Sequence, residues 1–463
     1  MSSYPLFVEY TICAVIYTIF CVLVLHAQSL RSKSSKNKNN TILTLLFVFS
    51  VIMCITVLSQ DIFIFFLGIE LLGIMSAIFT AIEKCSKPAL SVYAYNIFAS
   101  LLFLYGILNQ NTKLGEWCLL IACFCKSAQF PFSGWLLQAT HAHTFVSIFI
   151  HCATIIGIAP ICLYKFPSLI NLYQAITIFG LISAVILPAF ALFETNIKKI
   201  MAMLTISSAG IMIALCGLKH TDVSMVYFIC HAFFKSIIFL IFSYYIDYYK
   251  SKDFRVFKNN HGTRIIGCFA LLSALGIPPF IGSYAKLLVC SLQMPLFCKI
   301  SITLSTLLSD VVLIHLYKHC FSRPNAGQKF KLYPVWVLLV VSLLFSVIMF
   351  TELNNKVNYY AFIEELCVIF VAYIIANKIT VKQINLKIPR IPLYKVFSLT
   401  NYINRFIEHI YVAITYRNIY KTGIFLAKLH KNSFTIHVLW IFCGFLCMII
   451  HSIIYNFSRG NLQ

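Results

Sequence analysis

The chain has 463 residues, of which 60% are hydrophobic and only 11% are charged. Soluble domains carry about 25% charged residues, so this composition excludes a water-soluble globular protein. The apolar runs are about 20 residues long, the length at which an α-helix crosses a bilayer and roughly twice that of a transmembrane strand. The composition therefore predicts an all-α, polytopic membrane protein.

The formal net charge of the chain is +22 at pH 7, a value that also occurs in nucleic-acid-binding proteins. The Lys and Arg residues lie mostly between the apolar runs, however, where the positive-inside rule expects them in cytoplasmic loops. We therefore expect the lipid bilayer as a partner and no nucleic acid.

The sequence contains eighteen cysteines but no C-x-x-C pair, and most of the cysteines lie singly within apolar runs. Such cysteines are typical of small buried hydrophobic residues, so we expect no disulfide, no metal site and no iron–sulfur cluster. Neither a P-loop nor a G-x-G-x-x-G dinucleotide motif is present. We therefore expect no cofactor in this chain, and its energy must come from a partner or from an ion gradient.

Hydropathy predicts about fourteen membrane spans, with an error of a few residues at each boundary. The first span, 6–27, precedes a basic loop at 28–40, so this loop is expected in the cytoplasm and the N-terminus outside. The other predicted spans are 41–59, 62–82, 88–108, 115–132, 143–164, 169–192, 198–218, 222–247, 264–290, 298–319, 333–351, 358–377 and 434–456.

The spans form two blocks of five, 41–164 and 169–319, and proline interrupts the fourth span of each block, at Pro131 and at Pro278–Pro279. A block with an odd number of spans ends on the opposite side of the membrane from where it starts, so the second block has the opposite orientation. The pattern therefore predicts two inverted five-helix repeats with broken helices, an arrangement found in many ion-coupled transporters.

Four further segments complete the predicted domain organisation. They are an N-terminal span with its basic loop (1–40), two accessory spans (333–377), a basic segment (378–433) and a final span with its tail (434–463). The basic segment contains Pro389 and Pro392, followed by apolar residues separated by Lys and Arg. This pattern predicts a C-terminal lateral amphipathic helix that lies along the membrane or along neighbouring subunits.

Ionisable residues within apolar runs are costly and therefore mark functional candidates. Glu70 is a carboxylate in mid-span and needs a cationic partner, whereas Lys126 and Lys286 lie beside the two proline breaks. A desolvated lysine whose distance to a carboxylate changes can bind and release a proton. A static helix-packing pair for Glu70 and snorkelling of Lys126 to an interface remain alternatives.

Histidines provide further candidates. His231 and Lys235 share one helix face at i and i+4, and both can bind protons. His151 is alone in its span, where a purely packing role is an equal alternative. The remaining ionisable residues in apolar runs are Asp310, His315 and His319, the last two at metal-ligand spacing without a third ligand.

Several motifs together resemble the antiporter-like membrane subunits of respiratory complex I, most of all the subunit 5 (L) type. They are K-S-A-Q-F-P-F-x-x-W-L from Lys126, V-S-x-x-x-H-x-A-T from Val146, T-x-I-K-K-I-x-A from Thr195, H-A-F-F-K from His231 and G-I-P-P-F-x-G from Gly276. The resemblance runs from about residue 60 to 290. The same fold serves multisubunit cation/proton antiporters, membrane-bound hydrogenases and a bicarbonate-uptake complex.

The resemblance implies a role for each candidate residue. Glu70 and Lys126 would form an ion-pair switch, His151 and Lys235 a hydrated central axis, and Lys286 the terminal lysine that gates exit. The chain would be a proton-translocating subunit of an NADH-quinone oxidoreductase-like complex, located in a bacterial inner membrane or a mitochondrial-type energy-transducing membrane. Its partners would be other membrane subunits and protons, with Na⁺ as the alternative ion.

Some positions depart from the family pattern. His143-Thr-Phe-Val146 replaces Pro-Thr-Pro-Val, Gln138 replaces a frequent aspartate, Tyr227 replaces a histidine, and Leu287 replaces the acidic residue after the terminal lysine. Two alternatives therefore stay open. The chain could serve a cation/proton antiporter or another ion-coupled transporter, including bicarbonate uptake, or it could be a non-pumping scaffold paralogue.

Overall fold

The computed structural model describes residues 4–29, 36–83, 85–257, 261–321, 332–353 and 359–378. Within these ranges the regular elements are helices, and one isolated bridge joins Asn196 to Asp253. The chain divides into two compact units, 1–405 and 406–463, and all described residues belong to the first. The predicted lateral segment beyond Lys378 and the predicted span 434–456 lie outside the described residues.

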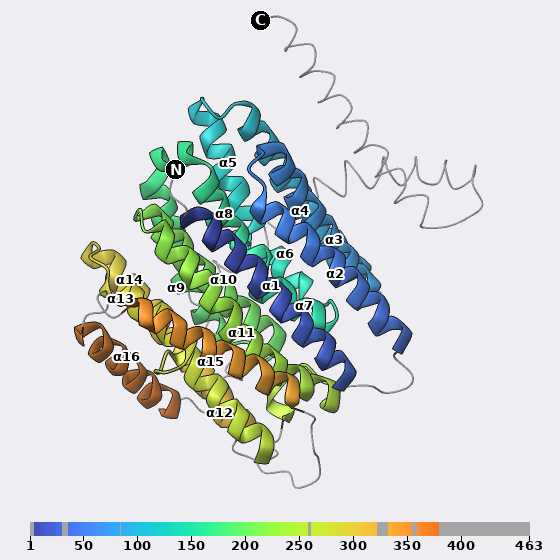
Figure 1. Cartoon of the computed structure of the whole chain (residues 1–463), viewed down its shortest axis with the longest axis vertical. Helices are drawn as coiled ribbons and strands as arrows, with labels where there is room; N and C mark the ends of the chain where they lie inside the picture. Colours follow the sequence, from blue (N-terminus) through green and yellow to red (C-terminus); the bar gives the residue numbers. More distant parts are fainter. Residues whose placement is uncertain are drawn as a thin grey trace, which may run out of the picture. The chain divides into compact units, whose positions relative to one another are not determined.

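The first predicted block follows helix α1 (Tyr4–Ser29) and forms a continuous series of helices (Figure 1). Its members are α2 (Lys36–Leu58), α3 (Ile62–Ile82), α4 (Ser86–Leu108), α5 (Lys113–Lys126), α6 (Gly134–Ala139), α7 (Thr144–Ala153), η2 (Ile155–Gly157) and α8 (Ile158–Lys165). The fourth predicted span corresponds to the interrupted pair α5 and α6, and the fifth to the interrupted series α7, η2 and α8.

The second block repeats this plan. Its members are η3 (Pro167–Leu172), α9 (Tyr173–Ala191), α10 (Ile197–Gly217), α11 (Thr221–Tyr249), η4 (Phe254–Val256), α12 (His261–Leu275), α13 (Ile281–Ser291) and α14 (Leu296–Phe321). The fourth span is again interrupted, between α12 and α13. Two accessory helices follow, α15 (Tyr333–Leu353) and α16 (Tyr359–Lys378).

Ten of the described helices are long and apolar enough to cross a membrane. Large apolar side chains also cover their outward faces, including Leu101 at 62% and Leu344 at 62% exposure. A hydrocarbon environment removes the cost of exposing such residues to water. The chain is therefore an integral, multi-pass membrane protein with the predicted all-α fold.

Contacts at the helix ends establish the inversion of the second block. At one end, Lys165, the last residue of α8, donates to Glu9 of α1 and to the carbonyl of Ser59 between α2 and α3. At the other end, Ser29 of α1 forms a hydrogen bond with Tyr244 of α11. Helix α2 therefore starts at the Ser29 end, whereas α9 starts at the Lys165 end, so the two blocks run in opposite directions.

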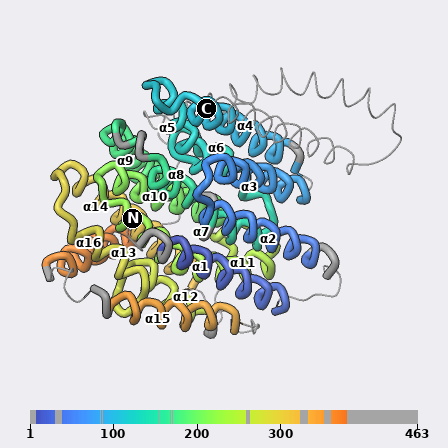
Figure 2. The backbone as a smooth tube through the Cα atoms, turned by 45° about the horizontal axis from the view of Figure 1, so that its top comes forward, coloured from blue at the N-terminus to red at the C-terminus, as the bar shows by residue number. Residues whose placement is uncertain are grey.

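Helices α10 and α11 occupy the interior, and in each the most apolar window is 94% buried. Helix α10 packs closely on α9 because Gly180 and Gly210 face each other. A Cβ atom at Gly180 would lie 2.7 Å from the Gly210 carbonyl oxygen. Helix α11 contacts α7 of the first block and α13 of the second, and α1 packs between α2 and α15 (Figure 2). Helix α11 therefore joins the two blocks.

Candidate functional site

The first helix break begins directly after Lys126, which is the last residue of α5. Ala128 has a φ of 55°, a left-handed conformation that ends the helix, and the Phe130–Pro131 bond is cis. The indole N–H of Trp135 donates to the carbonyl oxygen of Cys125 at 2.8 Å and so satisfies a carbonyl freed by the break. The predicted span 115–132 is therefore interrupted directly after Lys126, before the proline.

Lys126 forms a buried ion pair with Glu70 of α3, as the sequence predicts. Its Nζ lies 2.9 Å from Glu70 Oε1, and the two side chains are 1% and 9% exposed. Ser100 of α4 completes the cluster, because it accepts from Lys126 at 3.0 Å and donates to Glu70 Oε2. One ammonium and one carboxylate leave this site electrically balanced. Ser100 could not be predicted from the sequence, since a serine in an apolar span carries no distinctive signal.

The middle of the molecule holds His151 of α7 together with His231 and Lys235 of α11. All three are at most 2% exposed. The ring of His151 stacks on Phe239, one turn beyond Lys235, with centroids 5.7 Å apart. His231 and Lys235 interact electrostatically, and Lys235 also interacts with Asp310 and Lys286. His151 therefore packs against the helix that carries His231 and Lys235, at the junction of the two blocks.

The ring nitrogens of His151 and His231 make no hydrogen bond to any described residue. A buried polar group without a partner destabilises the fold by about 1–3 kcal/mol. Buried water is the usual partner for such groups. The arrangement is thus suited to a short row of hydrated, proton-binding side chains.

The second helix break resembles the first but places its lysine differently. Gly276 has a φ of +83°, and the Pro278–Pro279 bond is cis. Lys286 lies in the middle of α13 and reaches back to donate to the carbonyl of Leu275, at the end of α12, at 2.9 Å. A Cβ atom at Gly276 would lie 2.6 Å from Lys286 Cδ, so only glycine fits both this conformation and this contact.

Lys286 contacts two carboxylates from different helices. Its Nζ lies 3.0 Å from both oxygens of Asp310 on α14 and 2.8 Å from Glu365 Oε1 on α16. The side chains of the lysine and the two acids are 8%, 1% and 4% exposed. In the family pattern an acidic residue follows the terminal lysine, but Leu287 stands there. In this chain the acidic partners come from distant helices instead.

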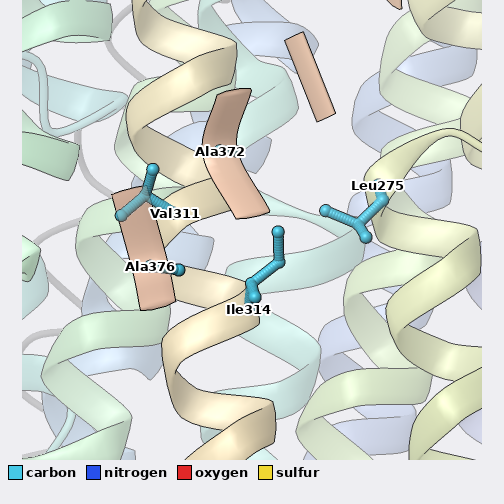
Figure 3. Packing of buried hydrophobic residues seen from close by; sticks show 5 residues of the cluster. All are labelled: Leu275, Val311, Ile314, Ala372 and Ala376. Atoms are coloured by element: carbon cyan, nitrogen blue, oxygen red, sulfur yellow. The ribbon is translucent and has the colours of Figure 1, made fainter. Parts of the chain in front are cut away.

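Glu365 was not among the predicted site residues, and packing explains its position. Ala372 and Ala376 of α16 are buried against Val311 and Ile314 of α14 and Leu275 of α12 (Figure 3). Small residues at i+7 and i+11 from Glu365 let this face of α16 approach α14 closely. The same face therefore directs Glu365 towards Asp310. In the sequence, only the spacing of these alanines indicates which face of α16 packs against α14.

His315 and His319 lie apart from this arrangement. Their ring centroids are 6.4 Å apart, and both rings pack edge-on against Phe254. Within the part of the chain that the structure describes, no group of three or more His, Cys, Asp or Glu side chains could hold a metal ion. These histidines therefore pack near the end of α14.

Inverted repeats, two broken helices and buried lysines paired with carboxylates define an antiporter-like membrane protein. Comparison with known families agrees with this class. Residues 108–309 match the family described as "NADH:quinone oxidoreductase/Mrp antiporter, TM". The resemblance noted in the sequence is therefore confirmed over these residues.

The chain is also similar to named relatives. It is 31% identical over 314 residues to NADH-ubiquinone oxidoreductase chain 5 of Paramecium tetraurelia, covering 58% of this chain and 55% of that protein. It is 29% identical over 307 residues to NADH-quinone oxidoreductase subunit L of Rickettsia felis, covering 57% and 47%. The chain spans about half the length of the curated relatives it matches.

A solved structure of the Mrp complex from Dietzia sp. DQ12-45-1b shares the fold of this chain. The TM-score is 0.65, and the alignment covers 96% of this chain and 55% of the other at 16% identity. The similarity therefore extends over the helices on both sides of the matched domain.

Proposed function

We propose that this chain is a proton-translocating membrane subunit of an NADH-quinone oxidoreductase-like complex. One observation carries the proposal. Buried ionisable groups extend from Glu70 and Lys126 in the first block, through His151 and Lys235 at the junction, to Lys286 in the second. Charged groups at membrane depth are costly and typically mark ion pathways. The oxidoreductase subunits among its relatives support the choice of complex.

Glu70 and Lys126 act as the switch of the proposed mechanism. The carboxylate stabilises the lysine ammonium while the two groups are in contact at 2.9 Å. A conformational change driven by redox chemistry in other subunits separates them and removes this stabilisation. Lys126 then releases its proton, because an unpaired buried ammonium is strongly disfavoured.

His151, His231 and Lys235 receive the proton and pass it towards Lys286 through bound water. Lys286 lies in the middle of α13, and this helix ends at Ser291, at the same end of the bundle as Lys165 and the start of α1. If loop 28–40 is cytoplasmic, this end faces outwards. The proposed direction of proton release is therefore away from the cytoplasm.

Partner subunits supply the redox chemistry, so the chain acts as an enzyme only within the complex. Purification from the native membrane tests this assignment. Co-purification of NADH-oxidising subunits would support it. Co-purification of cation/proton antiporter subunits alone would overturn it in favour of the antiporter function, which the shared fold also permits.

Glu70→Gln and Lys126→Met test the switch in the assembled complex. We expect both variants to lose proton translocation coupled to NADH oxidation. Glu70→Gln removes the carboxylate that stabilises the ammonium, and Lys126→Met removes the group that binds the proton. Glu9→Gln is the matched control, since Glu9 pairs with Lys165 at 3.2 Å but lies at the membrane edge. Wild-type translocation in both switch variants would refute the proposed mechanism.

A further inference from the structure

The charges around Lys286 do not balance. One ammonium contacts two carboxylates, Asp310 and Glu365, and none of the three side chains is more than 8% exposed. If all three groups were ionised, the cluster would carry one uncompensated negative charge. An uncompensated charge in a low-dielectric interior is strongly disfavoured, and a carboxyl group there takes up a proton instead.

Other charged or titratable groups from each packed helix lie near the cluster. They are Tyr227 and Lys235 on α11, Cys290 on α13, Lys299 on α14 and Glu364 on α16. Lys299 pairs with Glu364 at 2.8 Å, so these two charges cancel. Lys235 is the remaining candidate counter-charge, but it makes no ion pair with a described carboxylate, whereas Lys286 contacts both acids directly. We therefore expect the positive charge that compensates the second carboxylate to lie within the cluster itself.

A narrow, partly open pocket adjoins the cluster. The buried residues Lys286, Glu365 and Tyr227 line this pocket. Glu364 also lines it and forms a partly exposed ion pair with Lys299. Thr303 and Thr306 of α14 add hydroxyl groups to the wall. Successive residues of α16 thus present one carboxylate to the buried cluster and one to the half-exposed rim.

We infer that Asp310 and Glu365 hold one extra proton between them beside the Lys286 ammonium, and that this proton exchanges with the outer surface through the pocket. The cluster is then a proton store in place of a second ion-pair switch. The retained proton does not depend on the proposed function. Only the direction of its movement, outward through the pocket, rests on that function.

Infrared difference spectroscopy of the full chain in its native membrane complex tests the retained proton. We expect wild type to show a protonated-carboxyl band that shifts in deuterated water and that is lost in Glu365→Gln. Because the proton is shared, Asp310→Asn should remove the same band, which provides a second variant if Glu365→Gln fails to assemble. Glu70→Gln is the matched control and should leave the band unchanged, since the Glu70–Lys126 pair is balanced.

Each outcome of this measurement decides the proposal. Loss of the band in either amide variant supports it, even if proton translocation by the complex is never observed. Identical spectra for wild type and both assembled variants would overturn it, because all three groups would then be ionised. Loss of translocation with identical spectra would support the proposed function while refuting the store.

Filling the pocket tests the exchange path. Thr306→Phe should slow hydrogen–deuterium exchange of the carboxyl band at least several-fold, because its side chain enters the space between the cluster and the rim. Leu304→Phe is the control, since Leu304 lies on the outward face of the same helix and is 41% exposed. Equal exchange rates in wild type and Thr306→Phe would exclude the pocket as the route.

Discussion

The two broken helices present the same kind of residue in different electrostatic settings. At the first break, Lys126 ends its helix and contacts one carboxylate and one hydroxyl group. At the second, Lys286 lies inside its helix and contacts two carboxylates and a carbonyl oxygen. Each inverted repeat thus has a buried lysine beside its helix break, but the two lysines differ in position and in charge balance. A balanced pair responds to separation, whereas a cluster with an extra carboxylate responds to protonation.

Replacing each lysine with methionine should produce the largest effects and should separate the two sites. Lys286→Met leaves two buried carboxylates without their shared cation, whereas Lys126→Met leaves one. Removing one partner of a buried pair costs about 3–5 kcal/mol. We expect lower thermal stability of the complex in both variants and the larger loss for Lys286→Met.

Double variants provide the control for this comparison. Adding Glu70→Gln to Lys126→Met should restore most of the lost stability, because no unpaired charge remains. Adding Glu365→Gln to Lys286→Met should restore less, since Asp310 stays unpaired. Full recovery in the second double variant would show that Glu365 alone carries the imbalance.

Ser100→Ala probes the hydroxyl group that bonds Lys126, whereas the hydrogen bonds described for Lys286 go to a carbonyl and a carboxylate. Ser100 bonds both partners of the first pair, so its loss should destabilise the complex by about 1.5–3 kcal/mol, as for hydrogen bonds to charged groups. Proton translocation should slow without being abolished, because the ion pair itself remains. Ser76→Ala is the control, since Ser76 is buried but bonds only the backbone of its own helix. Equal effects of the two substitutions would show that the hydrogen bonds of Ser100 to the ion pair add no stability.

The sequence predicted those parts of the site that depend on local signals. Apolar runs located the helices, prolines located both breaks, and an isolated carboxylate in mid-span identified Glu70 as a partner for a lysine. The His231–Lys235 face follows from helical spacing alone. The roles assigned to these residues remain predictions, because geometry shows where the side chains lie and not whether they move protons.

Long-range partners could not be predicted in the same way. Glu365 lies 79 positions after Lys286, and no periodicity connects α16 to α13. The exact end of α5 could not be predicted either. Ala128 follows α5 with a positive φ that alanine rarely adopts, so the sequence indicated only the later Pro131.

The left-handed residues at the two helix breaks, Gly276 and Ala128, predict substitutions with different effects on stability. Gly276→Ala should destabilise by about 1–2 kcal/mol from backbone conformation alone, with more from the close approach of Lys286. Ala128→Gly relieves the same conformational penalty at the first break but increases the entropy of the unfolded chain. We therefore expect a small net change or a slight stabilisation. Thermal unfolding of the two variants measures the difference, and destabilisation of equal size would refute this account.

The smallest expected effect concerns an ion pair outside both sites, in the loop between α11 and α12. Hydrogen bonds from Arg255 lower the pKa of Asp253 below its ordinary value of 3.8. The pair therefore contributes stability above that value, and the contribution disappears as the pH falls through the lowered pKa. Both side chains are about one-third exposed, at 35% and 30%, so solvent screening limits the contribution to about 0.2–1 kcal/mol.

Asp253→Asn should remove this acid-dependent part of the stability and leave proton translocation unchanged, because the pair lies outside the row of buried groups. Thermal unfolding between neutral pH and the acid limit of the complex is the measurement, with Asp61→Asn as a control. Asp61 accepts backbone hydrogen bonds at the start of α3 but forms no described ion pair. An exposed pair that contributed as much as Lys126–Glu70 would show that burial does not set the strength of these interactions. The contrast between the two lysine sites would then need another cause.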